Sequence, residues 1–594
     1  MSPTTPAKKP HPAASRERAA NAPDIADDER ERLDDALHAL GEGRHLWPHL
    51  TLTQRMRLLE RLHETLAAHA EEWAETAAAI AGLAPDSPLR GEVWLEGPHN
   101  AVTTVDALRA TLAKLAAGRS PLDGVDLEPA PGDRLRAHAF PLSAADSLLL
   151  SGFTGEVWFE PGATADELRA AAGLGQLTPT EPAELGLVLG AGNVASIPFA
   201  DVLSELFAHN RVILLKVNPT HDRLLPVFER VLAPLIEPGL VRVVRGGAEA
   251  GAYLTRHPAV EHVHITGAAA TLERIVWGTG PQAKRRRREN RPLVRTPISA
   301  ELGGVSPIIV VPGRWTDADL AYQAENIATM RLENSGHNCI AGQVVMISAD
   351  WDQRDAFLAA LRHAYGSAPH RTPWYPGAQS RLDAAASDYP DAAWFADRTR
   401  ALVEIDDADP RALEQTEYFA PVLGVVSIPG NGQEFLDAAV ARANSALAGT
   451  LGANVLIDPD TEAALGEGFE RAIAELRYGA IAINTWTAFV FMMPTLTWGA
   501  YPGNTLQDPG SGIGIVHNAL LLDRVERSIG RGPFRPFPRS AGAIAGPGRF
   551  SVLPKPPWFV TSRTGASVCE DFTRYRLAPN ARTLSRIVTG ALRS

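Results

Sequence analysis

The stretch LGLVLGAGNVASIPFADVLSELFAHNRVILLKV (residues 185–217) decides the fold class. Its two apolar runs, LGLVLG and RVILLKV, flank a segment of helical periodicity, and LVRVV and EHVHITG repeat the unit further on. Near-continuous apolar strands that alternate with helices are typical of a parallel sheet covered by helices on both faces. A second series follows Glu301, with the runs IIVV, QVVMIS, LGVVSI, ANVLI and AIAIN. The sequence therefore predicts an α/β fold with two doubly wound domains that meet near residues 300–305.

The chain before this stretch has a different character. Residues 1–40 are predicted to be a disordered tail, because the first part is rich in Pro, Ala and charge without an apolar period. Residues 52–116 have helical periodicity. In SLLLSGFTGEVWFEP (147–161), two glycines separate alternating apolar residues, which favours a short β-hairpin.

Composition and charge exclude several classes of protein. The chain has 594 residues and a formal net charge of -12, which disfavours binding to nucleic acid or to an acidic membrane surface. Only Cys339 and Cys569 are cysteines, so we expect neither a disulfide framework nor a metal centre, and a reducing cytoplasm fits best. No signal peptide and no uninterrupted apolar run of about 18 residues is found, so neither secretion nor a membrane span is expected.

A doubly wound sheet binds its ligand at the carboxyl ends of the strands, where helix N-termini offer free N–H groups to phosphate. The chain has no GxGxxG fingerprint, and its nearest equivalent is the single turn at Gly267. The periodicity alone therefore indicates only an α/β protein that binds a nucleotide or another substrate.

Six motifs make the assignment more specific, because their order and spacing resemble those of the aldehyde dehydrogenase superfamily over roughly residues 50–515. They are GAGNVASIP (190–198), LLKVNP (214–219), HITG (264–267), ELGGVSP (301–307), NSGHNCIAGQVV (334–345) and EYFAPVLGVV (417–426). The resemblance implies a Rossmann-like cofactor-binding domain over 41–146 and 162–303 and a catalytic domain over 304–515. It also implies an oligomerisation arm from 147–161 and 550–565 in a homodimer or homotetramer, with 516–594 as a C-terminal extension.

Cys339 is the first candidate for chemistry. A lone cysteine is most often a small buried hydrophobic residue, and the residues alone favour that interpretation. Cys339 follows a Gly/Asn-rich turn and precedes Ala341–Gly342, so that backbone N–H groups can approach an atom bound to the sulfur. The resemblance implies that Cys339 is the nucleophile whose thiolate attacks the aldehyde and forms a thiohemiacetal.

Two further residues complete the expected catalytic set. Taken without the resemblance, Glu301 is expected to be a solvated or salt-bridged loop carboxylate. The resemblance implies that Glu301 is the general base that activates water to hydrolyse a thioester. Taken without the resemblance, Asn193 is expected to be a turn residue or a helix N-cap. The resemblance implies that the Asn193 amide and the backbone N–H of Cys339 together form an oxyanion hole. Relatives that transfer the acyl group to coenzyme A lack a Glu at the position of Glu301, so a free carboxylic acid is the expected product.

The cofactor is expected to be NAD or NADP. The resemblance implies that Lys216 binds the adenosine ribose, that Gly267 faces the pyrophosphate, and that Glu417 binds the nicotinamide ribose with Phe419 nearby. Many NAD-preferring relatives carry a Glu where this chain has Pro219, so the choice between the two cofactors stays open. The insert AKRRRRENRP (283–292) is either a solvated loop or a holder for a phosphate of NADP or for an acidic substrate.

The stretch NTWTAFVFMMPT (484–495) is expected to line the substrate tunnel, although its side chains could equally be core residues. An apolar lining would select an apolar or aromatic aldehyde as the small-molecule substrate. The residues concerned are Trp486, Phe489, Phe491 and Met492.

Two alternatives remain at this level. One is a coenzyme A-dependent acyl reductase of the same fold, which Glu301 disfavours. The other is a nucleotide-binding interaction protein without catalysis, for which the set of Cys339, Glu301 and Asn193 would serve no purpose.

Overall fold

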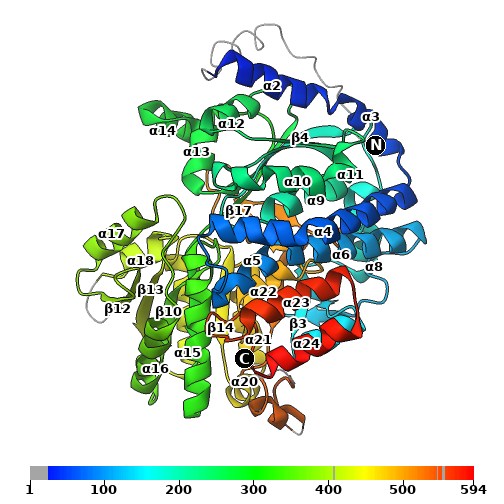
Figure 1. Cartoon of the computed structure of the whole chain (residues 1–594). Helices are drawn as coiled ribbons and strands as arrows, with labels where there is room; N and C mark the ends of the chain where they lie inside the picture. The colour runs from blue at the N-terminus through cyan, green and yellow to red at the C-terminus, as the bar shows by residue number, and fades with distance from the viewer. Residues whose placement is uncertain (1–24, 406–408, 545, 552–554, 594) are drawn as a thin grey trace.

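The computed structural model describes residues 25–405, 409–544, 546–551 and 555–593. These residues form two large sheets, each packed with helices, and one short two-stranded sheet (Figure 1). The first sheet lies in the upper half of Figure 1 and the second in the lower half. The predicted α/β class with parallel sheets is confirmed.

The first sheet has six strands in the order β17-β8-β7-β4-β5-β6. All neighbours are parallel except β17, which runs antiparallel to β8. The central strands are buried along almost their whole length, as their apolar runs predict. The strands are β4 (Glu184–Leu189), β5 (Arg211–Lys216), β6 (Val241–Val244), β7 (His262–Gly267), β8 (Ile298–Leu302) and β17 (Gly512–Ile513).

The second sheet has eleven strands in the order β1-β2-β3-β19-β15-β14-β9-β10-β13-β12-β11. Its centre, from β19 to β12, is parallel, and antiparallel strands close both edges. The strands are β1 (Leu127–Ala130), β2 (Arg134–Phe140), β3 (Thr154–Phe159), β9 (Ser306–Val310), β10 (Gly342–Ser348), β11 (Ala393–Phe395), β12 (Arg400–Ile405), β13 (Val422–Ile428), β14 (Gly452–Leu456), β15 (Ala480–Ile483) and β19 (Val525–Arg531). The short third sheet pairs β16 (Trp498–Gly499) with β18 (Ile515–His517).

Helices cover both sheets. The α-helices of the first half are α2 (Asp27–His38), α3 (Gly41–His49), α4 (Leu52–Ile80), α5 (Gly91–Trp94), α6 (Asn100–Ala116), α7 (Ala144–Leu149), α8 (Ala165–Ala171), α9 (Ile197–His209), α10 (Leu225–Val231), α11 (Ala233–Ile236), α12 (Ala248–Leu254), α13 (Ala269–Trp277) and α14 (Gly280–Arg288). Those of the second half are α15 (Asp317–Leu332), α16 (Arg354–Ser367), α17 (Ala378–Asp388), α18 (Arg411–Gln415), α19 (Gly432–Ala446), α20 (Pro459–Leu465), α21 (Glu467–Glu475), α22 (Thr487–Met492), α23 (Gly565–Leu577) and α24 (Ala581–Ala591). Shorter helical turns are η1 (Pro88–Arg90), η2 (Leu95–His99), η3 (Leu174–Gln176), η4 (Pro219–Leu224), η5 (Glu333–Gly336) and η6 (Arg539–Ile544).

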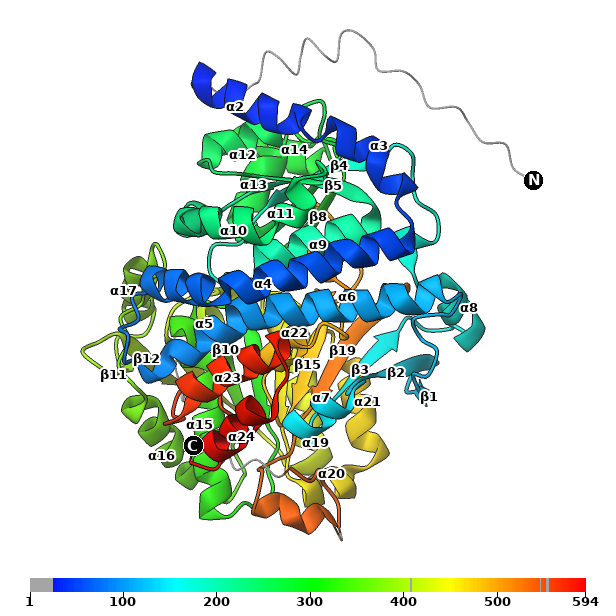
Figure 2. The ribbon, with the colours of Figure 1, turned by 45° about the vertical axis from the view of Figure 1, so that its right-hand side comes forward.

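The long helices α4 and α6 lie side by side across the middle of the molecule, between the two sheets (Figure 2). Thr51 and Gln54 form a capping box at the start of α4, which satisfies the free N–H groups of its first turn. The periodicity over 52–116 therefore correctly predicts helices. The ring of Trp73 packs edge-on against Phe199 of α9 and Phe228 of α10, which ties α4 to the helices of the first sheet.

The predicted disordered tail is wrong for its last part. Residues 1–24 lie outside the described residues, but α2 spans Asp27–His38 and packs near β6 and α12. The helix forms because Leu33 and Leu37, one turn apart, are buried, while Asp27 and Asp28 stabilise its positive N-terminal end.

The predicted hairpin over 147–161 is also wrong. Residues 144–149 form the helix α7, and only β3 is a strand, whose antiparallel partners are β2 and β19. The Ser143 side chain caps α7 by accepting a hydrogen bond from Asp146 N–H, so that the apolar run starts in a helix. No strand is described within 550–565, but this segment does meet 147–161, since the rings of Phe153 and Trp558 are in edge contact.

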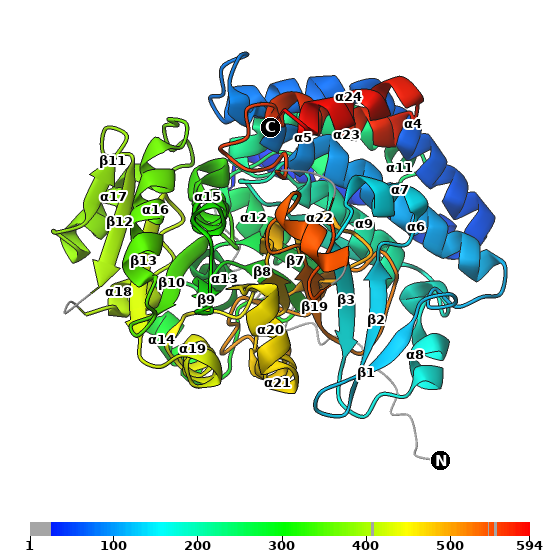
Figure 3. The ribbon, with the colours of Figure 1, turned by 90° about the horizontal axis from the view of Figure 1, so that it is seen from below.

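The sheets also cross the expected domain limits. Residues 127–140 pair within the second sheet, and β19 of the expected C-terminal extension lies inside that sheet between β15 and β3. Further along, α23 and α24 pack together beside α4 and α5 (Figure 3). None of the helices in the described residues is long and apolar enough to cross a membrane.

Candidate active site

Cys339 lies in the loop that joins α15 and η5 to β10, at the start of a central strand of the second sheet. The loop has an unusual backbone, because Asn334, Ser335 and Gly336 have φ angles of 48°, 55° and 68°, in the left-handed region. Side chains hold it in place: Trp374 donates to Asn334 Oδ1 (2.9 Å) and Asn334 Nδ2 donates to the carbonyl of Asn193 (3.0 Å). The thiol is presented by a strained turn that is fixed from several sides.

Glu301 reaches the same place from the first sheet, at the end of β8. The Cys339 thiol and the Trp498 indole lie close enough to its carboxyl group to lower the pKa of Glu301. Only 3% of Glu301 is exposed, and Oε1 has no hydrogen-bond partner among the described residues. Burial, aided by the negative charge of Asp201, raises the pKa of Glu301 to about 7, which is suited to a general base at neutral pH.

The thiol itself is neutral in this arrangement. Cys339 keeps part of its surface open, yet the dense surroundings and the charges of Glu301 and Glu417 raise its pKa well above the ordinary value. The backbone N–H of Cys339 lies within hydrogen-bonding reach of its own sulfur and favours the thiolate. Glu301 is therefore the adjacent acceptor for the thiol proton.

Asn193 lies in the turn between β4 and α9, close to the cysteine loop. Its amide Nδ2 donates to the carbonyl oxygen of His337 (2.8 Å), two residues before Cys339. An amide nitrogen carries two hydrogens, so one remains to donate to a negatively charged oxygen formed beside the sulfur. The geometry is compatible with an oxyanion hole built from Asn193 and the Cys339 backbone.

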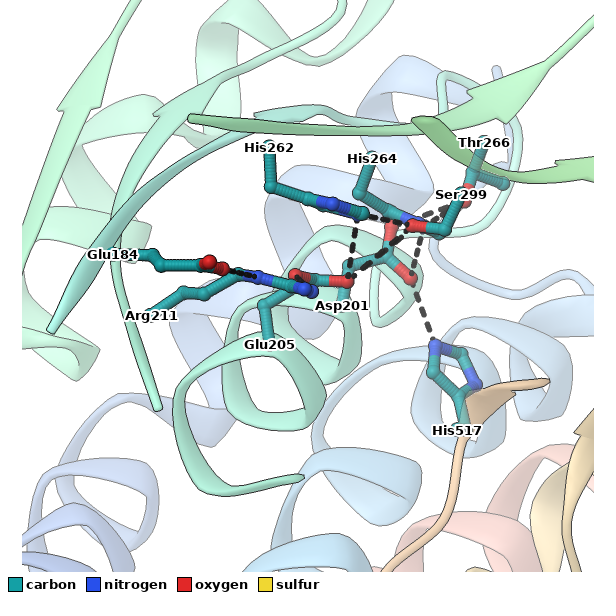
Figure 4. A network of polar contacts seen from close by, with 9 residues as sticks. All are labelled: Glu184, Asp201, Glu205, Arg211, His262, His264, Thr266, Ser299 and His517. Carbon is teal, nitrogen blue, oxygen red and sulfur yellow. Dashed lines mark hydrogen bonds and ion pairs between the residues drawn. The ribbon is translucent and has the colours of Figure 1, made fainter. Parts of the chain in front are cut away.

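A buried charged network underlies Glu301 (Figure 4). Asp201 of α9 has a fully buried side chain that accepts hydrogen bonds from His517 (2.8 Å) and Thr266 (3.1 Å) and forms an ion pair with His264 (3.4 Å). Ser299, two residues before Glu301 on β8, contacts His264 Nδ1 (2.9 Å). These contacts brace the strand that carries Glu301.

The protonation of this network follows from its partners. Burial alone would lower the pKa of His264, but Asp201 and Glu205 outweigh it and raise the pKa. Burial would likewise raise the pKa of Asp201, but His264 and His517 lower it. The pair is therefore an imidazolium and a carboxylate. Glu205 continues the network to Arg211 (2.7 Å) at the start of β5.

Two expected cofactor contacts lie on the first sheet. Lys216, at the end of β5, is 8% exposed and donates to the carbonyl oxygens of Gly246 (2.8 Å) and Val217 (3.1 Å). Gly267 ends β7 just before α13, and a Cβ added there would meet nothing within 4 Å. Open space in front of a helix N-terminus fits a pyrophosphate group.

The other two contacts lie before β13 of the second sheet. Glu417 accepts a hydrogen bond from the Gly304 N–H, while its Oε1 is buried without a partner among the described residues. Gly303 must lack a side chain, because an added Cβ would collide with this carboxylate. An orphaned acceptor of this kind fits a ribose hydroxyl, and burial, with the charge of Glu301, raises the pKa of Glu417 to about 8.

His337 connects this side of the site to the cysteine loop. Its Nδ1 donates to the carbonyl of Phe419 (2.8 Å), and its Nε2 accepts from the Tyr375 N–H (3.3 Å). Burial lowers the pKa of His337 to about 3, so the imidazole is neutral and structural. Phe419, whose φ is 46°, packs its ring against Tyr375 and His337.

The four expected substrate residues line one cavity, whose empty volume is about 1020 Å³. They are Trp486, Phe489, Phe491 and Met492. Sequence reasoning missed the polar part of this cavity, which contains Glu92, Glu96, His99 and Glu333. Two acids four residues apart in GEVWLEGPH, and an acid directly before Asn334, are the signals that could have revealed it.

The arginine-rich insert is a helix and not a loop. Residues 280–288 form α14, which has no buried residue. Arg287 donates to the carbonyl of Gln507 (2.9 Å) and pairs with Glu273, while Arg285 pairs with Glu289 (2.8 Å). Proline in the first turn and a run of side chains that suit an exposed helix explain the difference.

Comparison with known proteins agrees with this geometry. The model of the aldehyde dehydrogenase family matches residues 195–379, which include Glu301 and Cys339. Over these residues, which are less than half of the chain, the protein is similar to aldehyde dehydrogenases. This similarity supports an oxidoreductase that acts on aldehydes.

The individual relatives are distant in sequence. The 3,6-anhydro-alpha-L-galactose dehydrogenase of Streptomyces coelicolor is 28% identical over 423 residues, which are 60% of this chain and 77% of that protein. An aldehyde dehydrogenase of Enchytraeus buchholzi is 24% identical over 284 residues, 43% of this chain and 50% of that protein. The crystal structure of an NAD-dependent aldehyde dehydrogenase from Sinorhizobium meliloti has a TM-score of 0.55 at 20% identity, covering 85% of this chain and 86% of that one, and shows the common fold.

Proposed function

We propose that this protein oxidises an aldehyde to the carboxylic acid with NAD or NADP, through a thiohemiacetal and a thioester on Cys339. The observation that carries the proposal is the proximity of the Cys339 thiol to the buried Glu301 carboxyl group, close enough for each group to shift the pKa of the other. A nucleophile beside a base whose pKa lies near neutrality is the arrangement that such chemistry needs.

Each step has a group in place. Glu301 takes the thiol proton, and the Cys339 sulfur adds to the carbonyl carbon while the C=O π electrons move to oxygen. The second amide hydrogen of Asn193 and the Cys339 backbone N–H then stabilise the oxyanion. The nicotinamide, when bound, supplies the hydride acceptor, and the C=O bond re-forms from the oxyanion as hydride leaves the carbon, which gives the thioester. Glu301 passes the thiol proton to solvent and then removes a proton from water, whose oxygen adds to the thioester carbon. The new oxyanion collapses, the C–S bond breaks to release the acid, and the proton held by Glu301 returns to the Cys339 thiolate.

The cofactor is held by Lys216, Gly267, Glu417 and Phe419. The open position at Gly267 and the unpartnered oxygen of Glu417 support this assignment, since they fit a pyrophosphate and a ribose hydroxyl. The backbone after β5 carries Pro219 where a Glu would reject a 2'-phosphate, so both NAD and NADP are candidates.

The substrate is an aldehyde with an apolar or aromatic body. Trp486, Phe489, Phe491 and Met492 support this, because they line the cavity that leads to the polar groups of the cysteine loop. The active form is a homodimer or homotetramer in which 147–161 and 550–565 form the arm; the contact between Phe153 and Trp558 supports treating these segments as one unit.

A turnover assay tests the proposal. Purified protein is mixed with a panel of aldehydes and with NAD or NADP, with and without coenzyme A, and nicotinamide reduction is followed. Turnover that needs no coenzyme A and is absent from Cys339→Ala is expected. No turnover under any condition, or full turnover by Cys339→Ala, would contradict the proposal, and strict dependence on coenzyme A would favour an acyl reductase.

A further inference from the structure

The polar end of this cavity contains two neighbouring carboxyl groups. Glu96 of η2 and Glu333 of η5 both line it. Burial and the charges of Glu333 and Glu92 raise the pKa of Glu96, while burial and the charge of Glu92 raise the pKa of Glu333 to about 8. The pair therefore holds at least one proton near neutral pH.

The nearby arginines offset the charge of this pair only in part: Arg371 lowers the pKa of both carboxyl groups, but each arginine has an acid of its own. Arg371 forms a buried ion pair with Glu92, and Arg576, which also lines the cavity, pairs with Asp146 of α7. The amide of Asn338, which carries no charge, donates a hydrogen bond to Glu333. The four acids around this end, Asp146, Glu92, Glu96 and Glu333, therefore exceed the two arginines.

His99 is a second, independent observation at the polar end of the cavity. It lines the same cavity, is 5% exposed, and its Nδ1 has no hydrogen-bond partner among the described residues. Burial, aided by the charge of Arg576, lowers the pKa of His99 to about 3, so the ring is neutral and has one nitrogen that accepts a hydrogen bond. A buried polar atom without a partner is costly, and a ligand that supplies one removes the cost.

We propose that Glu96, Glu333 and His99 form a subsite for a protonated nitrogen, so that the substrate is an aldehyde whose apolar body carries an ammonium or a similar N–H cation. This inference rests on the proposed function. The apolar walls contact the apolar body of the substrate. The hydrogen-bond acceptors, which outnumber the cations here, bind its ammonium group and disfavour substrates that carry a carboxylate or phosphate group.

The subsite is tied to the nucleophile. Glu333 and Cys339 belong to the same loop, and Asn338, which bonds Glu333, directly precedes Cys339. The Asn334 N–H donates to Glu92 (3.1 Å), which fixes the loop against the segment that carries Glu96. This loop therefore fixes the position of Glu333 relative to Cys339, so we expect the length of the aldehyde to affect the rate.

Binding of a cation should also move protons. The proton held by the carboxyl pair leaves to solvent as the ammonium takes its place, since an adjacent positive charge favours the ionised form. The groups that face the pair are Glu92, Arg371, Asn338, His99 and Arg576.

The first test compares three straight-chain aldehydes of equal heavy-atom count: an ω-aminoalkanal, an ω-hydroxyalkanal and an alkanal. The amino compound should have a kcat/KM about ten- to hundredfold above that of the alkanal, the range of charge-assisted hydrogen bonds. Glu96→Gln should abolish this preference, and its circular dichroism spectrum and thermal unfolding midpoint report correct folding. Glu60→Gln, at an exposed position of α4, is the control. A preference for the alkanal or the hydroxyalkanal, or an amine preference that survives Glu96→Gln, overturns the inference.

The second test does not depend on catalysis. Binding of a straight-chain primary alkylammonium ion to Cys339→Ala is measured by titration calorimetry in buffers of different ionisation enthalpy. Saturable binding with proton release, lost in Cys339→Ala/Glu96→Gln, supports the subsite, and no saturable binding overturns it. If no aldehyde is turned over in the first test, the proposed function fails and this measurement still decides the subsite.

Discussion

Glu301 and Cys339 are positioned by different sheets, and their side chains lie close enough to shift each other's pKa. Glu301 lies at the end of a strand of the six-stranded sheet, while Cys339 precedes a strand of the eleven-stranded one. The two side chains therefore meet only when both sheets are in place, and the network around Asp201 and the turn at Asn334 each support one of them.

The rate should depend on pH through Glu301. Because its pKa is raised to about 7, Glu301 is protonated below that pH and cannot accept a proton. We expect kcat/KM to rise with pH through about 7, and Glu301→Gln to lose this limb of the profile. Rates measured between pH 5 and 9 at constant ionic strength test this, and an unchanged limb in the variant would assign it to another group.

Loss of the carboxylate should separate the two chemical stages. In Glu301→Gln, addition of the sulfur can still occur at high pH, but water is not activated, so steady-state turnover should fall by about 10²–10⁴. Rapid mixing at pH 9 should show a burst of nicotinamide reduction followed by a slow phase. Recovery of a covalent acyl adduct on Cys339 by mass spectrometry would identify the stalled species, and a variant with neither burst nor adduct would place Glu301 in the first stage.

Removal of the Asn193 amide should reduce the rate with little effect on substrate binding. Asn193→Ala deletes a donor to the oxyanion, which typically costs about 10²–10³ in kcat. The same change removes the bond to the His337 carbonyl, so circular dichroism and cofactor binding must be measured alongside. A rise in KM at constant kcat would instead indicate that Asn193 only holds the loop.

Glu417→Gln should weaken binding of the nicotinamide cofactor. The carboxylate has an unpartnered oxygen, and charged acceptors form hydrogen bonds worth about 1.5–3 kcal/mol. We expect the KM for NAD or NADP to rise about tenfold or more, with a smaller change in the KM for the aldehyde. Glu467→Gln, at an exposed position of α21, serves as the control.

The sequence predicts the strands well because each buried strand is an apolar run of its own. The errors fall where tertiary contacts override local pattern. Leu33 and Leu37 form a helix because they find a buried surface on the first sheet, and the apolar run at 147–149 follows a helix cap at Ser143. The local sequence pattern predicts coil or strand for these segments, because the surfaces against which they pack are formed by residues that are distant in sequence.

The candidate site shows the same division. Cys339, Glu301 and Glu417 stand in short motifs of glycine and polar residues, so the resemblance of these motifs to a known family names them as candidates. The carboxyl pair of Glu96 and Glu333 could not be predicted, because its members are far apart in sequence and meet only through the cavity. Acids in helical segments usually face solvent, so their pattern alone gave no reason to expect burial.

The buried pair of Asp201 and His264 should stabilise the fold most in mildly acidic solution. The lowered pKa of Asp201 contributes stability above its unfolded value of about 3.9, and this is lost as pH falls further. The raised pKa of His264 contributes below its unfolded value of about 6.5, and this is lost as pH rises through the folded value. Asp201→Asn leaves a buried imidazole without its counter-charge, which costs about 3–5 kcal/mol. The thermal unfolding midpoint of the variant should therefore fall furthest below that of the parent between about pH 4 and 6.5. Asp166→Asn, at an exposed position of α8, should leave the midpoint unchanged, and an Asp201→Asn deficit that is equal at every pH would show that packing and not charge is lost.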